Sequence, residues 1–219
     1  MKPLLIFNDH PLRQSEIFSN TESQLIDFNL ADDVELILIK AFYTQLESDA
    51  LFTSLLNSLH WQEEDIFIFS KWVKVPRLMC WYGDPDAYYQ YSGVNHQPKP
   101  WTLELQSIRG KVEQHCQCTF NSVLANLYRD GRDSMGCHTD DEKELGVNPV
   151  IASLSLGEER LFKMHHKKSK QSLNINLQHG DLLVMGGTCQ QYWLHSVPKT
   201  KALKKPRINL TFRKTQRTK

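Results

Sequence analysis

The sequence lacks the long apolar run that a membrane span needs. A spanning helix requires roughly 20 consecutive apolar residues, but the opening MKPLLIF ends at Phe7 and is followed by Asn8, Asp9 and His10. The same run is too short for the core of a secretory signal peptide. We therefore expect a soluble protein that stays in the cytoplasm and has no membrane partner.

Cysteine, glycine and proline are all scarce. The 219 residues include five cysteines, an odd number without regular spacing, which excludes a disulfide framework. His115, Cys116 and Cys118 stand close together, but structural zinc usually needs two separated ligand pairs, so ordinary thiols are the favoured interpretation. Without repeats or low-complexity linkers, collagen, coiled coil and wholesale disorder are excluded. The length suits one domain, or one domain with a small extension.

Net charge is also small, at +1, but it is unevenly distributed. Residues 1–66 contain 12 acidic and 3 basic side chains, whereas residues 67–219 contain 13 acidic and 23 basic ones. Two basic clusters stand out, one at residues 163–170 and one from Lys199 to the end. A basic body suits a polyanion such as nucleic acid. A solvated basic face with a basic tail explains the charge equally well.

The hydrophobic pattern changes along the chain. Apolar stripes predict helices over residues 34–59 and 101–118, the second with Trp101, Leu105, Ile108 and Val112 buried. Residues 65–93 are aromatic and β-prone, with a turn at 83–86. Short strands are expected at 122–129, 149–156, 160–165, 172–178, 181–186, 191–197 and 206–213. This order predicts a sandwich or closed β-structure backed by helices.

His138 and Asp140 are the first candidate metal ligands. Two residues apart on an extended segment, they point to the same side. His195, in the β-prone segment QYWLHSVP, can complete a set of two histidines and one carboxylate. Non-haem Fe(II) oxygenases use this set and leave coordination positions open. The triplet His-x-Asp alone is a weak signal.

The last predicted strand, RINLTFR, alternates strictly between polar and apolar residues. Ile208, Leu210 and Phe212 share one face, and the other carries Arg207, Asn209, Thr211 and Arg213. Packing of the apolar face on a core could leave the polar face in solvent. Alternatively, two arginines beside a metal could bind a dicarboxylate through paired, charge-assisted hydrogen bonds. Asn126 and Tyr128 add polar groups to an earlier strand.

These motifs together resemble the AlkB-type dioxygenases, which depend on Fe(II) and 2-oxoglutarate and repair alkylated nucleic acid. The resemblance covers roughly residues 65–214 and includes NLYRDG, HTDDEKEL and HGDLLVM. FSKWVKVPR and YYQYSG look most like the type that repairs double-stranded DNA. The implied fold is mainly β with flanking helices: a double-stranded β-helix, or jelly roll, with a nucleotide-recognition lid. We expect an acidic, partly helical extension at 1–64, the lid and jelly roll at 65–214, and a basic tail at 215–219.

The resemblance also implies roles for individual residues. The expected iron ligands are His138, Asp140 and His195, with 2-oxoglutarate and O2 as cosubstrates. Arg207 and Tyr128 correspond to the site of the distal carboxylate of 2-oxoglutarate, and Arg213 and Asn126 lie nearer its metal-side carboxylate. Asn209 and Thr211 line the same face.

The damaged base is expected in the lid. Tyr89, Gln90 and Tyr91 match the lid segment that holds it, Tyr91 stacks it against His138, and Asp141 and Glu142 face its polar edge. Phe69 matches a finger residue that fills the gap left by a flipped base, with Ser70 and Lys71 beside it. Without the resemblance, these aromatic residues would be assigned to a core or sheet surface.

The expected activity is oxidative demethylation of N-alkylated bases in DNA, such as 1-methyladenine and 3-methylcytosine, with release of succinate, CO2 and formaldehyde. Both duplex and single-stranded DNA are expected partners, and the protein is expected to be a monomer. Two alternatives remain open: the same chemistry on RNA or protein, and a catalytically silent jelly roll that binds nucleic acid. Retention of all three candidate metal ligands argues against a silent module.

Overall fold

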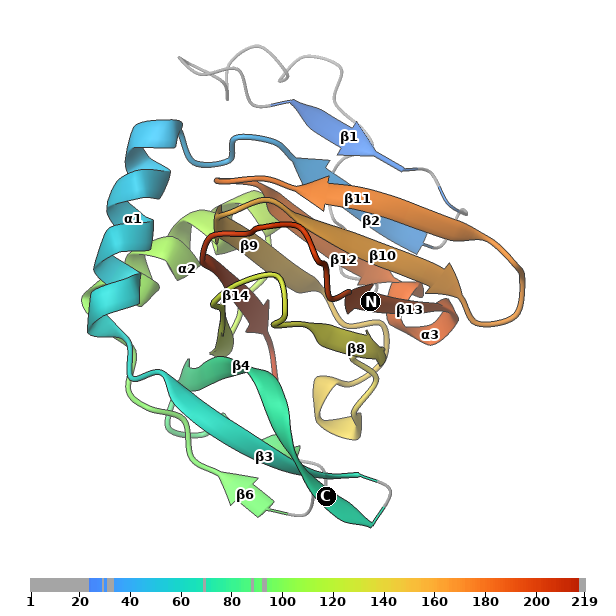
Figure 1. Ribbon diagram of the computed structural model, residues 1–219, viewed down its shortest axis with the longest axis horizontal. Coiled ribbons are helices and arrows are strands. Elements are labelled where there is room, and N and C mark those ends of the chain that lie inside the picture. The colour runs from blue at the N-terminus through green and yellow to red at the C-terminus, as the bar shows by residue number, and fades with distance from the viewer. Residues whose placement is uncertain are drawn as a thin grey trace.

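The computed structural model describes residues 24–28, 30, 34–68, 70–87, 89–91 and 94–216, which form two facing β-sheets with helices on one outer side (Figure 1). The large antiparallel sheet has the strand order β1-β2-β12-β9-β14-β7-β4-β3. Its strands are β1 (Leu25–Asp27), β2 (Val34–Ile39), β3 (Gln62–Ile68), β4 (Lys71–Gly83), β7 (Ser122–Tyr128), β9 (Ile151–Gly157), β12 (Leu182–Gly187) and β14 (Arg207–Arg213).

The small sheet has the order β11-β10-β13-β8 and is also antiparallel. It consists of β8 (Met135–His138), β10 (Arg160–His166), β11 (Ser172–Leu177) and β13 (Trp193–Val197). A separate hairpin pairs β5 (Tyr89–Tyr91) with β6 (Val94–His96). The helical elements are α1 (Gln45–Ser58), α2 (Leu103–Cys116), α3 (Cys189–Tyr192) and the 3-10 turn η1 (Lys143–Leu145).

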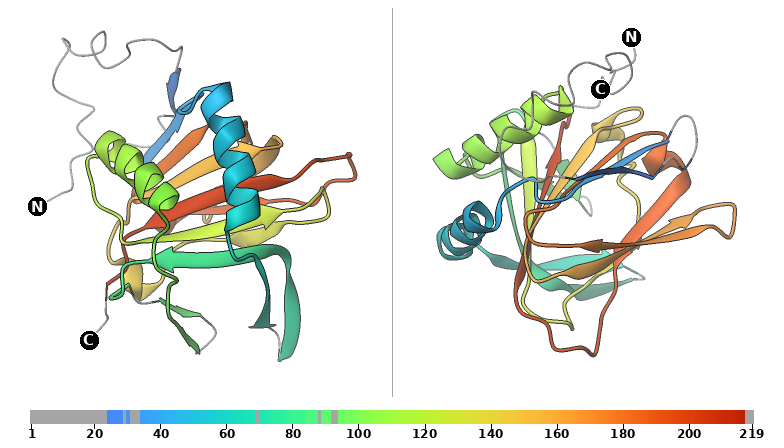
Figure 2. Two further views of the ribbon diagram at one scale, coloured as in Figure 1. Left: turned by 90° about the vertical axis from the view of Figure 1, so that its left-hand side faces the viewer. Right: turned by 90° about the horizontal axis from the view of Figure 1, so that it is seen from above.

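Two hydrophobic cores lie on opposite faces of the large sheet. On the outer face, Leu55 of α1 and Ile108 of α2 pack with Leu210 of β14. On the inner face, Leu36 of β2 packs with Met164 of β10. Figure 2 shows α1 and α2 together on the outer side. This packing of two sheets, covered by helices, confirms the expected jelly roll with flanking helices.

The expected helix over residues 34–59 is wrong in its first part, which is strand β2. Val34, Leu36 and Leu38 face the inner core, whereas Ile37 and Ile39 face the outer one. Because both faces of β2 are buried, residues 36–39 are a continuous apolar run, which periodicity cannot assign to strand or helix. The helix begins after Thr44, which forms a capping box with Glu47.

The other expected elements agree with the structure. Helix α2 buries Leu105, Ile108 and Val112, and Trp101 precedes it. A strand lies at each of the seven expected positions after residue 119, while β8 and α3 were not expected. The extension assigned to residues 1–64 contributes β2 and α1 to the body of the fold, since β2 pairs with β12. Residues 1–23 of that extension, and 217–219 of the expected basic tail, lie outside the described residues.

In the part of the chain that the structure describes, no helix is both long and apolar enough to cross a membrane.

Candidate active site

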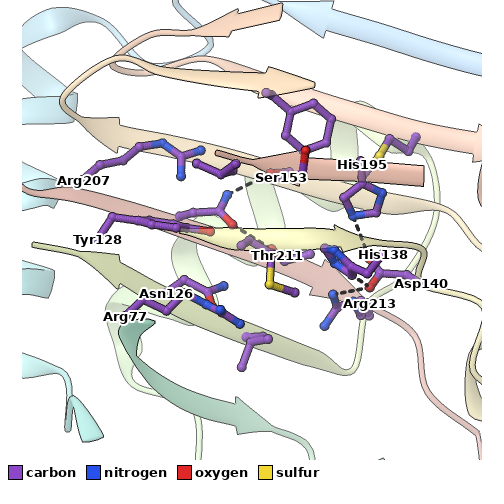
Figure 3. A pocket seen from close by; sticks show the side chains of 17 residues that line it. Arg77, Asn126, Tyr128, His138, Asp140, Ser153, His195, Arg207, Thr211 and Arg213 are labelled. Carbon is purple, nitrogen blue, oxygen red and sulfur yellow. Dashed lines mark hydrogen bonds and ion pairs between the residues drawn. The ribbon is translucent and has the colours of Figure 1, made fainter. Parts of the chain in front are cut away.

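A pocket opens between the two sheets, and side chains from both line it (Figure 3). All nine residues expected to bind the metal or the cosubstrate line this pocket: Asn126, Tyr128, His138, Asp140, His195, Arg207, Asn209, Thr211 and Arg213. They come from β7, β8, β13, β14 and the segment after β8. Residues from positions 126 to 213 therefore meet at one site.

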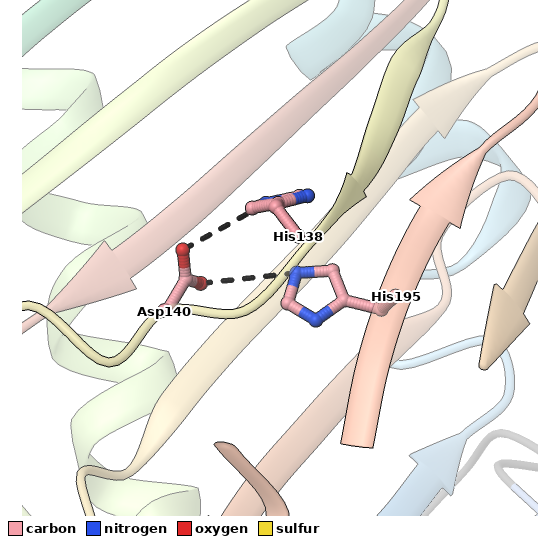
Figure 4. Close-up of side chains that lie close together, drawn as sticks. All are labelled: His138, Asp140 and His195. Carbon is pink, nitrogen blue, oxygen red and sulfur yellow. Dashed lines mark ion pairs between the residues drawn. The ribbon is translucent and has the colours of Figure 1, made fainter. Parts of the chain in front are cut away.

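The three expected metal ligands lie together in this pocket (Figure 4). His138 ends β8 and pairs in register with His195 of β13, which places the two rings 4.2 Å apart between centroids. Asp140 follows two residues after His138. One ligand atom from each residue lies within 4.8 Å of the others, and among the described residues no other group of His, Cys, Asp and Glu meets this criterion.

Both histidines can present a neutral ring nitrogen to a metal. Nδ1 of His138 lies 2.9 Å from the carbonyl oxygen of Gly136; because a carbonyl only accepts, Nδ1 carries the proton and Nε2 is left as the ligand. Burial, helped by His138, lowers the pKa of His195 to about 3. His195 is therefore unprotonated near neutral pH.

Asp140 is buried yet remains a carboxylate. Burial by itself would raise the pKa of its carboxyl group, but Arg213, His195 and His138 together bring the pKa below its ordinary value. Arg213 donates from Nη2 to Oδ1 of Asp140 over 2.8 Å. The other oxygen, Oδ2, is buried and accepts no hydrogen bond from the described residues.

The spacing of these atoms fits a bound divalent cation. Nε2 of His138 lies 3.8 Å from Oδ1 of Asp140, and Nε2 of His195 lies 4.0 Å from Oδ2. These distances are too long for hydrogen bonds. A buried carboxylate oxygen without a hydrogen bond is costly unless something else satisfies it. Two neutral imidazoles and one carboxylate are the donor set that Fe(II) takes in non-haem oxygenases.

The polar face of β14 points into the pocket and not into solvent. Asn209 donates from Nδ2 to Oγ of Ser153 over 2.8 Å, and Thr211 donates to Oδ1 of Asn209 over 3.0 Å. The apolar face of the same strand lies in the outer core under the helices. Of the two interpretations open from the sequence, the solvent-side one is wrong, because helices cover one face of β14 and the small sheet covers the other.

Arg207 is a buried cation at the far end of this face. Its exposed fraction is 1%, Nη2 donates to Oγ of Ser155 over 2.9 Å, and the guanidinium lies 5.2 Å from the Tyr128 ring centroid. Nε and Nη1 have no hydrogen-bond acceptor among the described residues. Burial lowers the pKa of Arg207 to about 10, so the charge persists at neutral pH. An anionic ligand would satisfy it.

Some residues in the pocket or bonded to its lining were not expected. Arg77 of β4 is buried and donates from Nε to Oδ1 of Asn126 over 2.6 Å, and Ser153 and Ser155 of β9 hold Asn209 and Arg207. Sequence signals for these residues are poor. Arg77 follows a Pro in a β-prone segment, and the serines alternate with leucines, patterns that fit an exposed face as well as a pocket.

Of the expected substrate residues, the four whose side chains are described do not line this pocket. Ser70 and Lys71 are exposed at the β3–β4 hairpin, and Asp141 is exposed and pairs with Lys167 over 3.5 Å. Glu142 is half-buried. Tyr89, Gln90 and Tyr91 form β5, but their side chains are not among the described ones. Phe69 lies outside the described residues.

Comparison with known proteins gives a consistent result. The model of the 2OG-Fe(II) oxygenase superfamily matches residues 35–213. The chain is 38% identical over 183 residues to the DNA oxidative demethylase ALKBH2 of Bos taurus, a match covering 78% of this chain and 66% of that protein. The human ALKBH2 is also 38% identical, with coverages of 81% and 72%.

A second group of relatives is equally similar. The alpha-ketoglutarate-dependent dioxygenase alkB homolog 3 of Bos taurus is 38% identical, over 80% of this chain and 64% of that protein. The chain thus spans about two thirds of the length of the two bovine relatives. A solved structure titled "The structure of OsALKBH1" superposes with a TM-score of 0.61, covering 82% of this chain and 96% of the other at 18% identity, which supports the fold alone.

Proposed function

Because the chain belongs to the 2OG-Fe(II) oxygenase superfamily, we propose that it removes N-alkyl groups oxidatively from bases in DNA. The relatives named DNA oxidative demethylase support this choice of substrate. The observation that carries the proposal is one pocket that combines His138, Asp140 and His195 with a buried arginine cation, Arg207. O2 and 2-oxoglutarate are consumed, and succinate, CO2 and formaldehyde are released.

In this proposal His138, Asp140 and His195 hold Fe(II). Bound Fe(II), with O2 and 2-oxoglutarate, supplies the oxidation that turns an N-methyl group into a hydroxymethyl group, which leaves as formaldehyde. The low pKa of His195 and the hydrogen bond of His138 to Gly136 keep a lone pair available on each ring. Arg213 fixes one oxygen of Asp140 and leaves the other for the metal.

The polar face of β14 and its neighbours bind 2-oxoglutarate. Arg207 takes the distal carboxylate through its nitrogen atoms without acceptors, with Tyr128 beside it. Arg213 and Asn126 lie nearer the carboxylate at the metal, and Asn209 and Thr211 line the face between. Asn209 and Thr211 are already held by hydrogen bonds to their neighbours. Little conformational entropy is therefore lost when the cosubstrate binds to this face.

The damaged base enters from the side of the lid. Substrates such as 1-methyladenine and 3-methylcytosine are cationic, so the carboxylates of Asp141 and Glu142 favour them electrostatically. The segment Tyr89, Gln90 and Tyr91 holds the base, with Tyr91 stacking it against His138. Base flipping costs a few kcal/mol, and least for a lesion whose pairing is already broken.

The proposed partner is alkylated DNA, in duplex or single-stranded form. RNA is an alternative substrate for the same chemistry. Phe69, Ser70 and Lys71 favour duplex DNA in this proposal, because in the sequence a candidate wedge stands beside a basic residue. We propose that the protein acts as a monomer in the cytoplasm.

The decisive experiment incubates the protein with Fe(II), 2-oxoglutarate and an oligonucleotide containing 1-methyladenine. Formaldehyde and the restored base should appear together, one for one. Asp140→Ala should abolish both while leaving the fold intact, because the two hydrophobic cores do not include this residue. Demethylation by Asp140→Ala in metal-controlled buffer would contradict the metal assignment; absence of demethylation by the wild-type protein would contradict the substrate.

A further inference from the structure

Gln190 is a buried amide that contacts the metal-ligand segment from outside the pocket. It lies on α3, the short helix before β13, and only 2% of its surface is exposed. Its Oε1 accepts the main-chain N–H of Asp140 over 3.0 Å. The hydroxyl of Thr139 lies 3.4 Å from the same oxygen, and Nε2 contacts Sδ of Met185 over 3.5 Å.

This contact replaces a strand hydrogen bond at Asp140. Strand β8 ends at His138, so Asp140 lies beyond the ladder that pairs β8 with β13. A buried N–H without an acceptor costs about 1–3 kcal/mol, and here the Gln190 amide is the acceptor. The main chain of Asp140 is therefore located by Gln190, while its carboxylate is oriented by Arg213.

The main-chain oxygen of Gln190 extends the contact to both neighbours of Asp140. It accepts the hydroxyl of Thr139 and the Nζ of Lys167, the latter over 3.0 Å. Lys167 in turn pairs with Asp141. Each residue from 139 to 141 is thus connected to Gln190, directly or through Lys167.

We propose that Gln190 is a positioning residue of the iron site: its amide fixes the main chain of Asp140 so that the carboxylate can reach the metal. The inference rests on the metal site of the proposed function and adds a residue that is not a ligand. Partners of metal ligands typically contribute about 10- to 100-fold in metal affinity, and we expect an effect in this range.

The test measures metal binding itself, with Mn(II) as a redox-stable probe followed by electron paramagnetic resonance. Gln190→Met keeps the volume of the side chain and removes the acceptor. It leaves the main-chain oxygen that binds Thr139 and Lys167. Mn(II) affinity should fall by about 10-fold or more. The matched control is Gln191→Met, because Gln191 is the next residue on α3 and is exposed; its Mn(II) affinity should equal that of the wild-type protein.

Gln190→Glu is the rescue variant, since it keeps an acceptor oxygen at the same reach. It should bind Mn(II) at least as tightly as the wild-type protein, so that a loss found in Gln190→Met and not in Gln190→Glu is due to the acceptor oxygen. Wild-type affinity in Gln190→Met, equal losses in Gln190→Met and Gln191→Met, or weakened binding in Gln190→Glu would each overturn the inference. Absence of demethylation by a protein that binds Mn(II) would count against the proposed substrate alone, because the Mn(II) comparison uses no DNA.

Discussion

At the scale of single residues, the pocket is defined by charged groups that water hardly reaches. Arg207 and Asp140 are 1% and 3% exposed, and a buried charge must be paired or ligated to be tolerated. Asp140 has Arg213 on one oxygen, whereas the described partners of Arg207 are neutral, namely the hydroxyl of Ser155 and the side chain of Tyr128. Removal of Asp140 should therefore affect metal binding, whereas removal of Arg207 should affect the binding of an anionic cosubstrate.

Replacing Arg207 should weaken the binding of 2-oxoglutarate. In Arg207→Ala the cosubstrate loses a charge-assisted pair worth about 1.5–3 kcal/mol, so its KM should rise by about 10-fold or more. Arg132→Ala is the control, because Arg132 is exposed and pairs only with Asp130 among the described residues. Steady-state kinetics at varied 2-oxoglutarate will measure both, and an unchanged KM in Arg207→Ala would make Arg207 structural.

The buried His195 should make the metal-free protein less stable in mild acid. Its pKa is about 3 in the fold, against about 6.5 in an unfolded chain. Between these values only the unfolded state binds the proton. The free energy of unfolding therefore falls as the pH decreases below about 6.5, by up to roughly 1.4 kcal/mol per pH unit, and the effect is absent above neutral pH.

Urea unfolding of the metal-free protein at two pH values will measure this effect. Between pH of about 7 and 5, the wild-type protein should lose roughly 1–2 kcal/mol more than His195→Gln, which has no proton to bind. Equal losses would mean that His195 is not held neutral by burial.

At the scale of elements, the turn of the β3–β4 hairpin carries exposed residues, Ser70 and Lys71. Ile68 pairs with Lys71 at the end of this hairpin, and Ser70 has a φ of 60°. Positive φ values are required in the tight turns that match the twist of paired strands.

Phe69→Ala should affect duplex and single-stranded substrates differently. If Phe69 fills the gap left by a flipped base, its loss removes stacking worth roughly 1–3 kcal/mol per base. Activity on methylated duplex DNA should fall by about tenfold, and activity on the same lesion in a single strand only slightly. A core phenylalanine would behave otherwise: truncation would cost about 3–5 kcal/mol of stability, lower the melting temperature and reduce both activities together.

At the scale of the whole molecule, charge is separated along the chain. Residues 1–66 sum to −9 (3 − 12) and residues 67–219 to +10 (23 − 13). Lys168 and Lys170 are exposed in the loop after β10, and the neighbouring Lys167 contacts α3 beside the metal ligands. The basic loop is thus connected to the site, which suits a polyanionic substrate.

The affinity for DNA should accordingly depend on salt through these lysines. Every phosphate that a variant no longer neutralises should reduce the slope of log affinity against log salt by about 1. The double variant Lys168→Ala and Lys170→Ala should therefore reduce the slope by up to about 2. The control is Lys40→Ala. Lys40 lies in the acidic part of the chain and donates a hydrogen bond to Gln178, and its loss should leave the salt slope unchanged. Fluorescence anisotropy at several salt concentrations will test this, and equal slopes would exclude the loop from the interface.

The sequence by itself determined the elements in which polar and apolar residues alternate, and the identity of the candidate ligands. Strict alternation in β14 predicted which residues share a face, and His138, Asp140 and His195 could be recognised from their residue types and motifs. Local spacing is enough for such features, because a strand repeats every two residues whatever surrounds it.

Only the tertiary structure decided which faces are buried and which distant residues meet. β2 could not be separated from a helix, because the helices and the small sheet bury both of its faces. The contacts of Arg77 and Gln190 could not be predicted from the sequence, since their partners, Asn126 and Asp140, lie 49 and 50 residues away. Contacts of this kind follow from the pairing of strands and the packing of one sheet on another, which no local pattern encodes.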